Sequence, residues 1–442
     1  MANRYWVLNT GTWDNSTTKN WSTSSGGLGG ASVPGASDDV IFDANSCLLS
    51  GTVTPNYDLS VKSITMGAFT GTLDFSANNN SPTMQTWNNT GTGTRTLHRG
   101  SGTWTITGFN GTIWNCGTST NLTEDGTGII NCTYAGSTGH RMIQSGGASH
   151  PYTNVKISAG TDSIWLSGDG STSDSAGYLD FTGFSGVFST NDSYNNMRFS
   201  GNLILSPTMT VNGGNGKTWT FNSTSAQTIT SNGIKLNVEI TFNGVGGTWT
   251  LQDDLDMSGA SIRTLGMTNG ILNANGHTVT CGAVGNNADG TKGIGNGNFI
   301  LVGTGSGNRV WGTGTITGTN IWTILNNTNI KITDSSSSDA LIFQGGGLTY
   351  NNLWFSRGAS TASNSVTYSN TFNDFKDDGT AAHSIIFTHG NTTGFTTWNI
   401  NGADASNLIT ITSDTAATFT LKNNGTAPVF AQYLDISKSV AT

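Results

Sequence analysis

GTWTI, residues 102–106, sets the pattern of this chain, and close copies of it occur as KTWTF at 217–221 and GTWTL at 247–251. Alternate side chains of a β-strand lie on opposite faces, so Trp104 and Ile106 are expected to point into a core, while Thr103 and Thr105 point to water. Gly or Asn lies at the ends of such segments, and both residues turn a chain at low energetic cost. The pattern predicts many short strands joined by tight turns.

The composition leaves little room for helix. Charged residues make up 10% of the chain, and the only glutamates are Glu124 and Glu239, whereas roughly a quarter of a typical soluble domain is charged. Good helix formers are therefore scarce, and Gly, Thr, Asn and Ser take their place. Hydrophobic residues still reach 34%, with 13 Trp and 19 Phe spread along the chain. Apolar residues at regular intervals favour a folded all-β protein over a disordered chain.

A longer repeat is superimposed on the short one. Residues 102–155 and 297–353 carry the same order of motifs, and the matched pairs are Trp114 and Trp311, Gln144 and Gln344, and Tyr152 and Tyr350. In the second copy Gln344 begins QGGG, residues 344–347. The residues that follow are Thr, Tyr and Asn, so no helix start is expected that could bind a phosphate. We interpret the glycines as a tight turn where one coil passes close to the next.

Repetition at several lengths, low charge and Asn/Gly turns favour an all-β fold, a parallel β-helix (β-solenoid) with duplicated strand-turn units. With about 20 residues in each coil, the chain would form on the order of 20 coils. The alternative is a row of tandem antiparallel β-sandwiches, which would suit a stricter period. We expect an N-terminal capping or attachment module at 1–45, solenoid repeats at 46–290, and a second copy of the repeats with the C-terminal end at 291–442.

Charge and cysteine content exclude several classes of function. The net charge of −8 and the pI near 5.0 argue against a nucleic-acid partner, because phosphate binding needs clustered Lys and Arg. No apolar run is long enough to predict membrane insertion. The four cysteines have no metal-ligand spacing and are predicted to be buried free thiols, with Cys116–Cys132 the only pair worth testing as a disulfide. No motif predicts a cofactor.

Several phrases of the chain resemble a known group of proteins. They include GTW at 11–13, NWS at 20–22, DDVIFD at 38–43, GILNANGHTVTCG at 270–282 and AQYLDISKS at 431–439. These phrases are similar to the Gly/Thr/Asn-rich repetitive β-solenoid proteins of bacteriophage virions, of the fibre or spike type, and to the repeats of bacterial surface adhesins. The group has no catalytic signature that could be transferred to residues of this chain.

The resemblance implies a non-enzymatic structural protein of a phage virion, a tail or head fibre or spike that contacts the host surface. Its expected partners are other virion proteins and a host-surface glycan or receptor, and a homotrimer is expected by analogy alone. The start MANRYWVLNTGTW lacks the apolar core of a secretory signal. We therefore expect assembly in the host cytoplasm and a final location on the particle. The alternatives are a secreted or surface bacterial adhesin and a tailspike-like glycan depolymerase.

Acidic residues are the first candidate site. Asp38, Asp39 and Asp43 could supply oxygens to Ca²⁺, but the same residues are typical of turns, where a carboxylate binds free backbone N–H groups. The turn interpretation is favoured. A match to a calcium-binding loop at 169–174 is weak, because the alternating acids and the distal Glu are missing.

Aromatic residues are the second candidate site. Trp322, Tyr350, Trp354 and Tyr368 are predicted glycan contacts if they are exposed, since their ring faces are apolar and can stack on sugars. A place in the core or at a subunit interface is the commoner use of such residues. A depolymerase would need two carboxylates about 5–10 Å apart, and no such pair stands out from the sequence.

Overall fold

The computed structural model describes residues 2–118, 120–146, 152–167, 174–189, 196–213, 217–259, 262–285 and 288–442. Their regular elements are strands and two single-turn 3₁₀ helices, η1 (Thr18–Asn20) and η3 (Ser306–Asn308). Among the strand pairs of these residues, β1 and β3 are antiparallel and the others are parallel. The prediction of a parallel β-solenoid is confirmed, and the alternative of antiparallel sandwiches is wrong.

The chain divides into two compact units, Met1–Lys217 and Thr218–Thr442. The modules 1–45, 46–290 and 291–442 rest on sequence repeats and on the resemblance of the N-terminal phrases, and they stay a prediction. The solenoid has about 16 turns, fewer than a 20-residue coil would give. The coils are longer than expected. For example, Gly290 pairs with Asn320 on the next coil, 30 positions later. None of the helices in the described part of the chain is long and apolar enough to span a bilayer.

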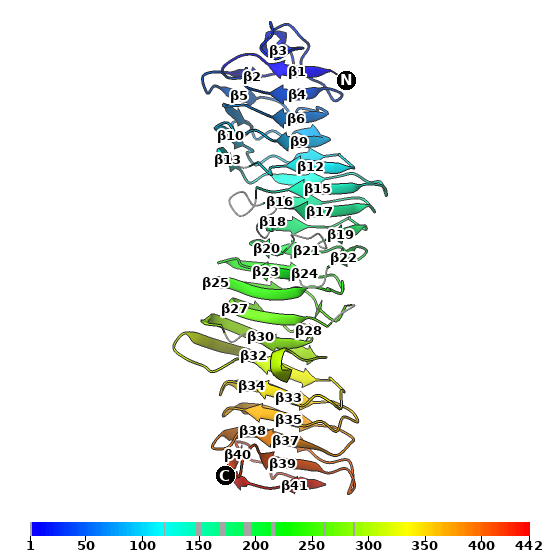
Figure 1. Cartoon of the computed structure of the whole chain (residues 1–442), viewed down its shortest axis with the longest axis vertical. Coiled ribbons are helices and arrows are strands. Elements are labelled where there is room, and N and C mark those ends of the chain that lie inside the picture. The colour runs from blue at the N-terminus through cyan, green and yellow to red at the C-terminus, as the bar shows by residue number, and fades with distance from the viewer. Residues whose placement is uncertain are drawn as a thin grey trace. The chain divides into compact units, whose positions relative to one another are not determined.

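The first unit stacks its strands in three sheets, and Figure 1 shows those of the first sheet one below another. The first sheet has the order β3 (Trp21–Ser22), β1 (Asn3–Trp6), β4 (Asp39–Phe42), β6 (Ser63–Met66), β9 (Thr86–Asn89), β12 (Gly111–Asn115), β15 (His140–Gln144), β17 (Ser163–Ser167), β19 (Val187–Ser189) and β22 (Thr210–Asn212). The second contains β2 (Gly11–Trp13), β5 (Thr52–Pro55), β7 (Thr72–Asp74), β10 (Arg95–His98) and β13 (Leu122–Asp125). The third contains β8 (Thr83–Met84), β11 (Trp104–Ile106), β14 (Ile129–Cys132), β16 (Tyr152–Ile157), β18 (Asp174–Asp180), β20 (Met197–Phe199) and β21 (Leu203–Ile204).

The second unit stacks longer strands in two main ladders. One ladder contains β23 (Thr218–Phe221), β25 (Glu239–Leu251), β27 (Thr264–Asn273), β30 (Gly290–Leu301), β32 (Asn320–Ile332), β34 (Thr349–Phe355), β36 (Thr371–Asp377), β38 (Thr392–Ile400), β40 (Phe419–Asn423) and β42 (Ser439–Ala441). The other contains β29 (Ala283–Gly285), β31 (Arg309–Gly312), β33 (Leu341–Gln344), β35 (Asn364–Thr367), β37 (His383–Phe387), β39 (Ile409–Ser413) and β41 (Leu434–Ile436). Three further strands complete the first coils: β24 (Ala226–Thr230), β26 (Leu255–Asp256) and β28 (Thr278–Cys281).

The core of each unit is built from the alternating pattern that the sequence predicts. Trp104 and Ile106 are fully buried, whereas the threonines beside them are partly exposed. Trp219 and Trp249 are buried in the same way on β23 and β25. Stacking of coils places rings above one another, as with Phe221 and Phe242, whose centroids lie 5.1 Å apart. Such pairs stabilise the solenoid beyond the burial of their area.

The predicted duplication is present in the strand register. Trp114 pairs with Ile143, the residue before Gln144, and Trp311 pairs with Phe343, the residue before Gln344. The next strand after each pair is the one that carries the matched tyrosine, β16 in one copy and β34 in the other. The side chain of Tyr152 and residues 147–151 lie outside the described part, so the first copy can be compared only in its strands.

The QGGG segment forms the tight turn that the sequence predicts. Gly346 and Gly347 have φ angles of +66° and +76°, in the left-handed region that side chains other than glycine adopt only at a cost. A Cβ on Gly346 would lie 2.5 Å from Thr313 Oγ1. The turn therefore requires glycine both for its backbone angles and for the close approach of the neighbouring segment.

The four cysteines are buried free thiols, as predicted, and Cys116 forms no disulfide with Cys132. Burial raises the pKa of Cys47 and of Cys132 to about 12. Because the thiolate is the reactive form, these side chains act as small apolar core residues.

Candidate functional site

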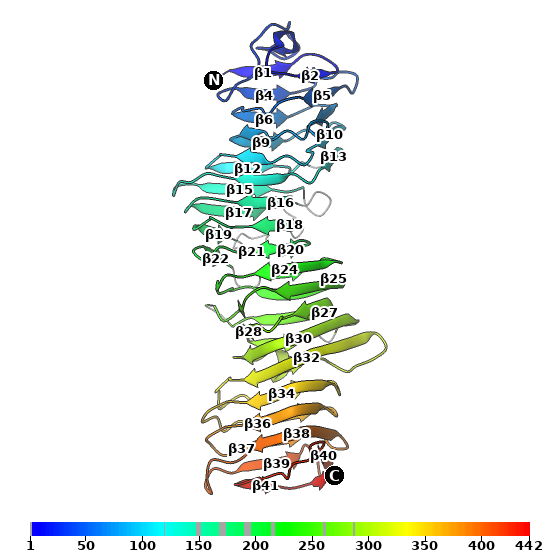
Figure 2. The same cartoon turned by 180° about the vertical axis from the view of Figure 1, so that it is seen from behind.

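The most distinctive feature of the second unit is a place where two neighbouring strands stop pairing. β30 pairs with β32 from Gly290–Asn320 to Leu301–Ile332, with one irregularity after Gly295. β34 pairs with β32 only from Asn329–Asn352 onward. Within the described range 288–442, the first half of β32 therefore pairs with β30 on one side, and on the other side it does not pair with β34. Figures 1 and 2 show a loop that projects beyond the other strands of this unit at the level of β32.

An extra residue in the middle of β32 bends this strand, and we call this place the β32 bend. The pairing offset between β30 and β32 changes by one residue between Gly295–Leu325 and Gly297–Thr328. Asn327 lies in the bulged segment and has a φ of +59°, a conformation that Asn tolerates better than most residues. The side chain of Thr328 fixes the bulge by donating from its Oγ1 to the carbonyl of Leu325 at 2.6 Å. Bulges of this kind redirect a strand.

A groove of about 530 Å³ opens between the bend and the starts of the next strands. The bend contributes one wall, and β34, β36 and β38 contribute the other wall and the floor. The residues that line it are Ile324, Leu325, Asn326, Asn327, Thr349, Tyr350, Asn351, Thr371, Phe372, Asn373 and Thr396. None of them carries a charge, and most offer an amide or a hydroxyl group. The groove can therefore form neutral hydrogen bonds, and its partly exposed apolar side chains are those of Ile324 and Leu325.

The floor of the groove is held rigidly. The rings of Tyr350 and Phe372 stack with centroids 5.8 Å apart. The Tyr350 hydroxyl donates to the carbonyl of Gly345 at 2.9 Å and accepts from Trp311 Nε1 at 3.1 Å. Burial raises the pKa of Tyr350 well above its ordinary value, against a smaller lowering by the hydrogen bond from Trp311. Tyr350 thus stays neutral and fixed, and both rings lie covered beneath the groove.

A ladder of amides runs along one edge of the groove. Asn329 donates from Nδ2 to Oδ1 of Asn298 at 3.0 Å, and Asn351 donates in the same way to Asn329 at 2.7 Å. Each amide is thereby oriented by the coil above it, as in other stacked Asn ladders. The bond to Asn329 uses the Nδ2 of Asn351, so the carbonyl oxygen of the same amide is left as an acceptor at the edge of the groove.

Trp354 lies on the same strand as the groove but does not present a free ring. Lys331 and Lys376 are its partners in the ladder on either side, and their Nζ atoms lie 3.7 and 3.9 Å from the ring centroid. Cation–π attraction favours this arrangement. A sugar could stack on the indole only after one of the lysines moved away. Contact of Trp354 with a glycan stays a prediction.

The other predicted aromatic contacts occupy different positions. The expectation that Tyr350 and Trp322 are exposed is wrong, because their side chains are 2% and 5% exposed. Alternation in the sequence gives two faces for each strand but does not say which is the inner one. Tyr368 is partly exposed, and its hydroxyl contacts Thr315 Oγ1 at 3.0 Å and Gln344 Nε2 at 3.4 Å. It ties a loop to the QGGG turn, and its role with a glycan stays a prediction.

The predicted acidic candidates are engaged in turns and coil contacts. The two carboxylate oxygens of Asp38 accept from the backbone N–H groups of Ala2 and Gly35, both at 3.2 Å. Asp39 contacts Lys62 Nζ at 2.9 Å and Ser63 Oγ at 2.6 Å. Burial raises the pKa of the Asp39 carboxyl, but these two contacts outweigh burial and lower it. Asp38 thus binds backbone N–H groups, as the turn interpretation expects, whereas Asp39 binds side chains of the next coil.

Asp43 is likewise a turn residue, since it accepts from the backbone N–H of Asn45 at 2.9 Å. Across the described residues, no group of three or more His, Cys, Asp or Glu side chains is arranged to hold a metal ion. The weak calcium match at 169–174 falls on residues and side chains outside that part of the chain.

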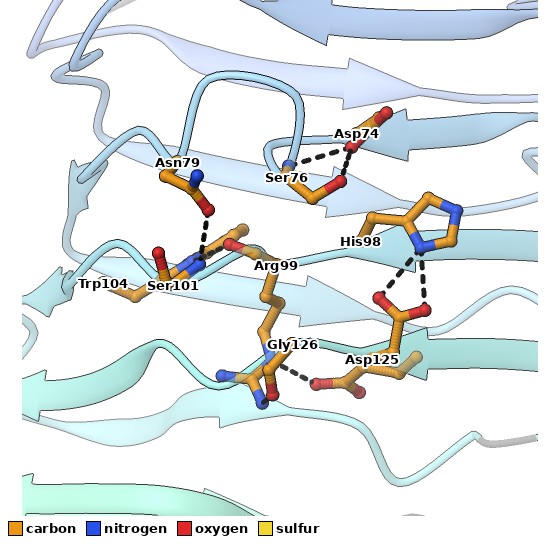
Figure 3. A network of polar contacts seen from close by, with 10 residues as sticks. Asp74, Ser76, Asn79, His98, Arg99, Ser101, Trp104, Asp125 and Gly126 are labelled. Atoms are coloured by element: carbon orange, nitrogen blue, oxygen red, sulfur yellow. Dashed lines mark hydrogen bonds and ion pairs between the residues drawn. The ribbon is translucent and has the colours of Figure 1, made fainter.

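A polar network in the first unit shows how such carboxylates are used (Figure 3). His98 Nδ1 lies 2.9 Å from both carboxylate oxygens of Asp125 on the next coil. Asp74 accepts from the backbone N–H of Ser76 at 2.8 Å and from its hydroxyl at 2.6 Å. Each contact either joins two coils or closes a turn. The network is therefore explained by folding, without a ligand.

One buried pair in the second unit was missed by the sequence analysis. Asp377 ends β36, and its Oδ2 lies 2.9 Å from Nε2 of His383, which begins β37. The other ring nitrogen of His383 lies 2.8 Å from the carbonyl of Ala381. Both nitrogens face acceptors, an arrangement that is satisfied when both carry a proton and the ring is a cation.

The environment of His383 agrees with this assignment. Burial lowers the pKa of His383, but the hydrogen bond and the charge of Asp377 outweigh burial and raise it above the ordinary value. A ring whose two nitrogens are both occupied cannot serve as a general base in this conformation. An Asp and a His six positions apart, on the two sides of a short turn between strands, were the signal that could have indicated the pair.

Comparison of the chain with protein-family models, with curated proteins and with solved structures finds no match.

Proposed function

We propose that this chain is a non-enzymatic structural protein of a phage virion, a tail or head fibre or spike that contacts a glycan on the host surface. The observation that carries the proposal is the uncharged groove at β32, which offers amides and hydroxyls beside the partly exposed side chains of Ile324 and Leu325. Glycans present many hydroxyl groups and small apolar ring faces, and a surface of this composition complements both.

The solenoid suits this role for physical reasons. Within each unit the coils are joined by parallel ladders and by stacked rings, so the surface of the unit is built without flexible connections between coils. The proposed partners are other virion proteins and a host receptor, with a homotrimer proposed by analogy with other virion fibres. The resemblance of the N-terminal and C-terminal phrases to virion proteins is the second support.

Two measurements test the proposal. Antibodies raised against the purified chain should label phage particles in electron micrographs, and the free chain should reduce adsorption of those particles to host cells. Label on the bacterial cell surface without particles would favour the adhesin alternative. Release of reducing ends from host capsule or lipopolysaccharide by the purified chain would favour the depolymerase alternative. Absence of both particle labelling and competition would contradict the proposal.

A further inference from the structure

We propose that the groove between the β32 bend and β34 is the glycan-binding site and that it selects an uncharged segment of glycan. The inference rests on the proposed function for the kind of ligand and goes beyond it by defining the charge of that ligand and the residues that exclude an acidic one. The volume of about 530 Å³ falls within the roughly 300–1,000 Å³ of ordinary small-ligand sites.

The groove is built into the fold rather than formed by chance between side chains. It exists because the one-residue bulge in β32 turns this strand away before it reaches β34. Below the groove β34 and β36 pair again from Thr349–Thr371 onward, so the lower wall is continuous. The stacked Tyr350 and Phe372 and the Asn351 amide are therefore fixed before a ligand arrives. A preorganised site loses less entropy on binding.

The charges around the groove favour a neutral ligand. Asn373 lies in the lining, and its neighbour Asp374 is a carboxylate on the same strand that accepts from Asn399 Nδ2 at 2.7 Å. The basic residues nearest along the strands, Lys331 and Lys376, are held against Trp354. An acidic sugar in the groove would therefore meet no cationic lining group. The whole chain also has a net charge of −8, which disfavours the approach of an anion.

An extended peptide is the competing ligand, because the first half of β32 could pair with an added strand. The lining favours a glycan over a peptide, since most of its residues offer an amide or a hydroxyl group. Only two apolar side chains, those of Ile324 and Leu325, are partly exposed and could receive the apolar side chains of a peptide. A peptide ligand is therefore an outcome that would overturn the inference.

The test uses the whole purified chain on an array of neutral oligosaccharides, made of unmodified hexoses and N-acetylhexosamines, and of matched sialylated and uronic acid oligosaccharides. The wild-type chain should bind members of the neutral set. Asn373→Asp places a carboxylate in the groove without changing its shape, and should weaken binding to the best neutral oligosaccharide by roughly 10-fold or more. Thr349→Trp places a large ring in the groove at the exposed start of β34 and should abolish binding.

The matched control is Asn110→Asp, since Asn110 is an exposed amide of the first unit. It changes the net charge by the same amount and should leave binding unchanged. Circular dichroism and the melting temperature would establish that each variant is folded. A loss of binding in the control equal to that in Asn373→Asp would overturn the inference, because net charge alone would then explain the effect.

The remaining outcomes separate the site from the proposed function. If the wild-type chain competes for adsorption and Asn373→Asp and Thr349→Trp compete equally well, the groove is not the glycan-binding site. The proposed virion role would be unaffected by that result. A chain that binds neutral oligosaccharides through the groove but labels no particles would support the groove and contradict the virion role. Preferential binding of acidic oligosaccharides, or of extended peptides, would overturn the inference.

Discussion

Two buried charged clusters, one in each unit, are stabilised in different ways. In the first unit the guanidinium of Arg141 binds the carboxylate of Asp162 through two hydrogen bonds, of 2.8 and 2.7 Å. In the second unit the guanidinium of Arg357 is held by carbonyl oxygens, among them those of Asp334 and Ser336, both at 2.7 Å. The buried carboxylate of the second unit, Asp377, is paired with His383 instead.

The difference matters because arginine keeps its proton at every accessible pH and histidine does not. The Arg141–Asp162 pair therefore stays intact wherever the carboxylate is ionised. The Asp377–His383 pair exists as an ion pair only while the ring is protonated. We expect the second unit to respond to pH near neutrality through Asp377–His383, whereas the Arg141–Asp162 pair of the first unit does not respond, and the following predictions test this comparison.

Asp162→Asn is expected to have the largest effect. It leaves the buried charge of Arg141 without its counter-ion, and removal of one partner of a buried pair costs about 3–5 kcal/mol. Hydrogen exchange measured by mass spectrometry under increasing denaturant would follow each unit separately, and the loss should appear in the first unit. Asp125→Asn is the control, since Asp125 is 59% exposed in its pair with His98 and such pairs contribute at most about 1 kcal/mol. Equal losses in the two variants would contradict the account.

Gly346→Val is expected to destabilise the second unit alone. A β-branched residue at a φ of +66° is strained by about 1–3 kcal/mol, and its Cβ would also meet Thr313. The melting temperature of the second unit should fall, while exchange protection of the first unit should not change. Gly318→Ala is the control, because a Cβ at Gly318 would have open space around it. An unchanged melting temperature in Gly346→Val would show that the turn is not required.

A rise in pH is expected to weaken the second unit. The pKa of His383 is raised in the folded state, so the folded state holds this proton more tightly than the unfolded state. The stabilisation is complete below the unfolded pKa of about 6.5 and is lost as pH rises through the higher folded pKa. Unfolding midpoints of each unit between about pH 5.5 and 9 would measure the effect.

His383→Gln should remove the part of this pH dependence that comes from the pair. The variant keeps a polar side chain but cannot titrate, so the second unit should be less stable at low pH and should follow a flatter curve above it. A pH dependence of the same size in wild type and variant would assign it to other groups. The first unit serves as the internal reference in the same samples.

Lys331→Met is expected to have the smallest effect. The lysine contacts the ring of Trp354 at 3.7 Å, and an exposed cation–π contact contributes about 0.5–1 kcal/mol. A double-mutant cycle with Trp354→Leu would isolate the pair, and Lys376→Met offers the matched change on the other side of the ring. A coupling energy near zero would show that the two lysines lie over the ring without stabilising it.

Much of the fold was predictable because it depends on local chemistry. The alternation around Trp104 fixes which side chains of a strand share a face, and the φ angles of a glycine turn such as that at Gly346 exclude other residues. The two copies at Trp114 and Trp311 could be recognised because the same strand-turn unit repeats. The number of coils was overestimated because turn insertions do not change the strand pattern.

The candidate site was not predictable in the same way. The groove depends on a change of one residue in the pairing of β30 with β32. The alternation of β32 breaks at this point, where Ile324 and Leu325 are followed by four polar residues, 326–329, but such a break does not say which neighbouring strand loses its partner. Whether Tyr350 and Trp354 face the core or the solvent depends on the corner at Asn351 and Asn352, where two successive residues are partly exposed. Register and corners are set by contacts between coils that are about 20–30 residues apart.

By itself, then, the sequence determined that this chain is an all-β solenoid with glycine turns, buried tryptophans and free thiols, because strand alternation, turn conformation and burial follow from the residue and its neighbours. Only the tertiary structure decided where the ladder between β32 and β34 opens, which aromatic rings are covered, and that Asp162 is paired with Arg141 and Asp377 with His383. Those features depend on which coils lie next to each other, and stacking brings together side chains whose separation in the chain carries no local signal.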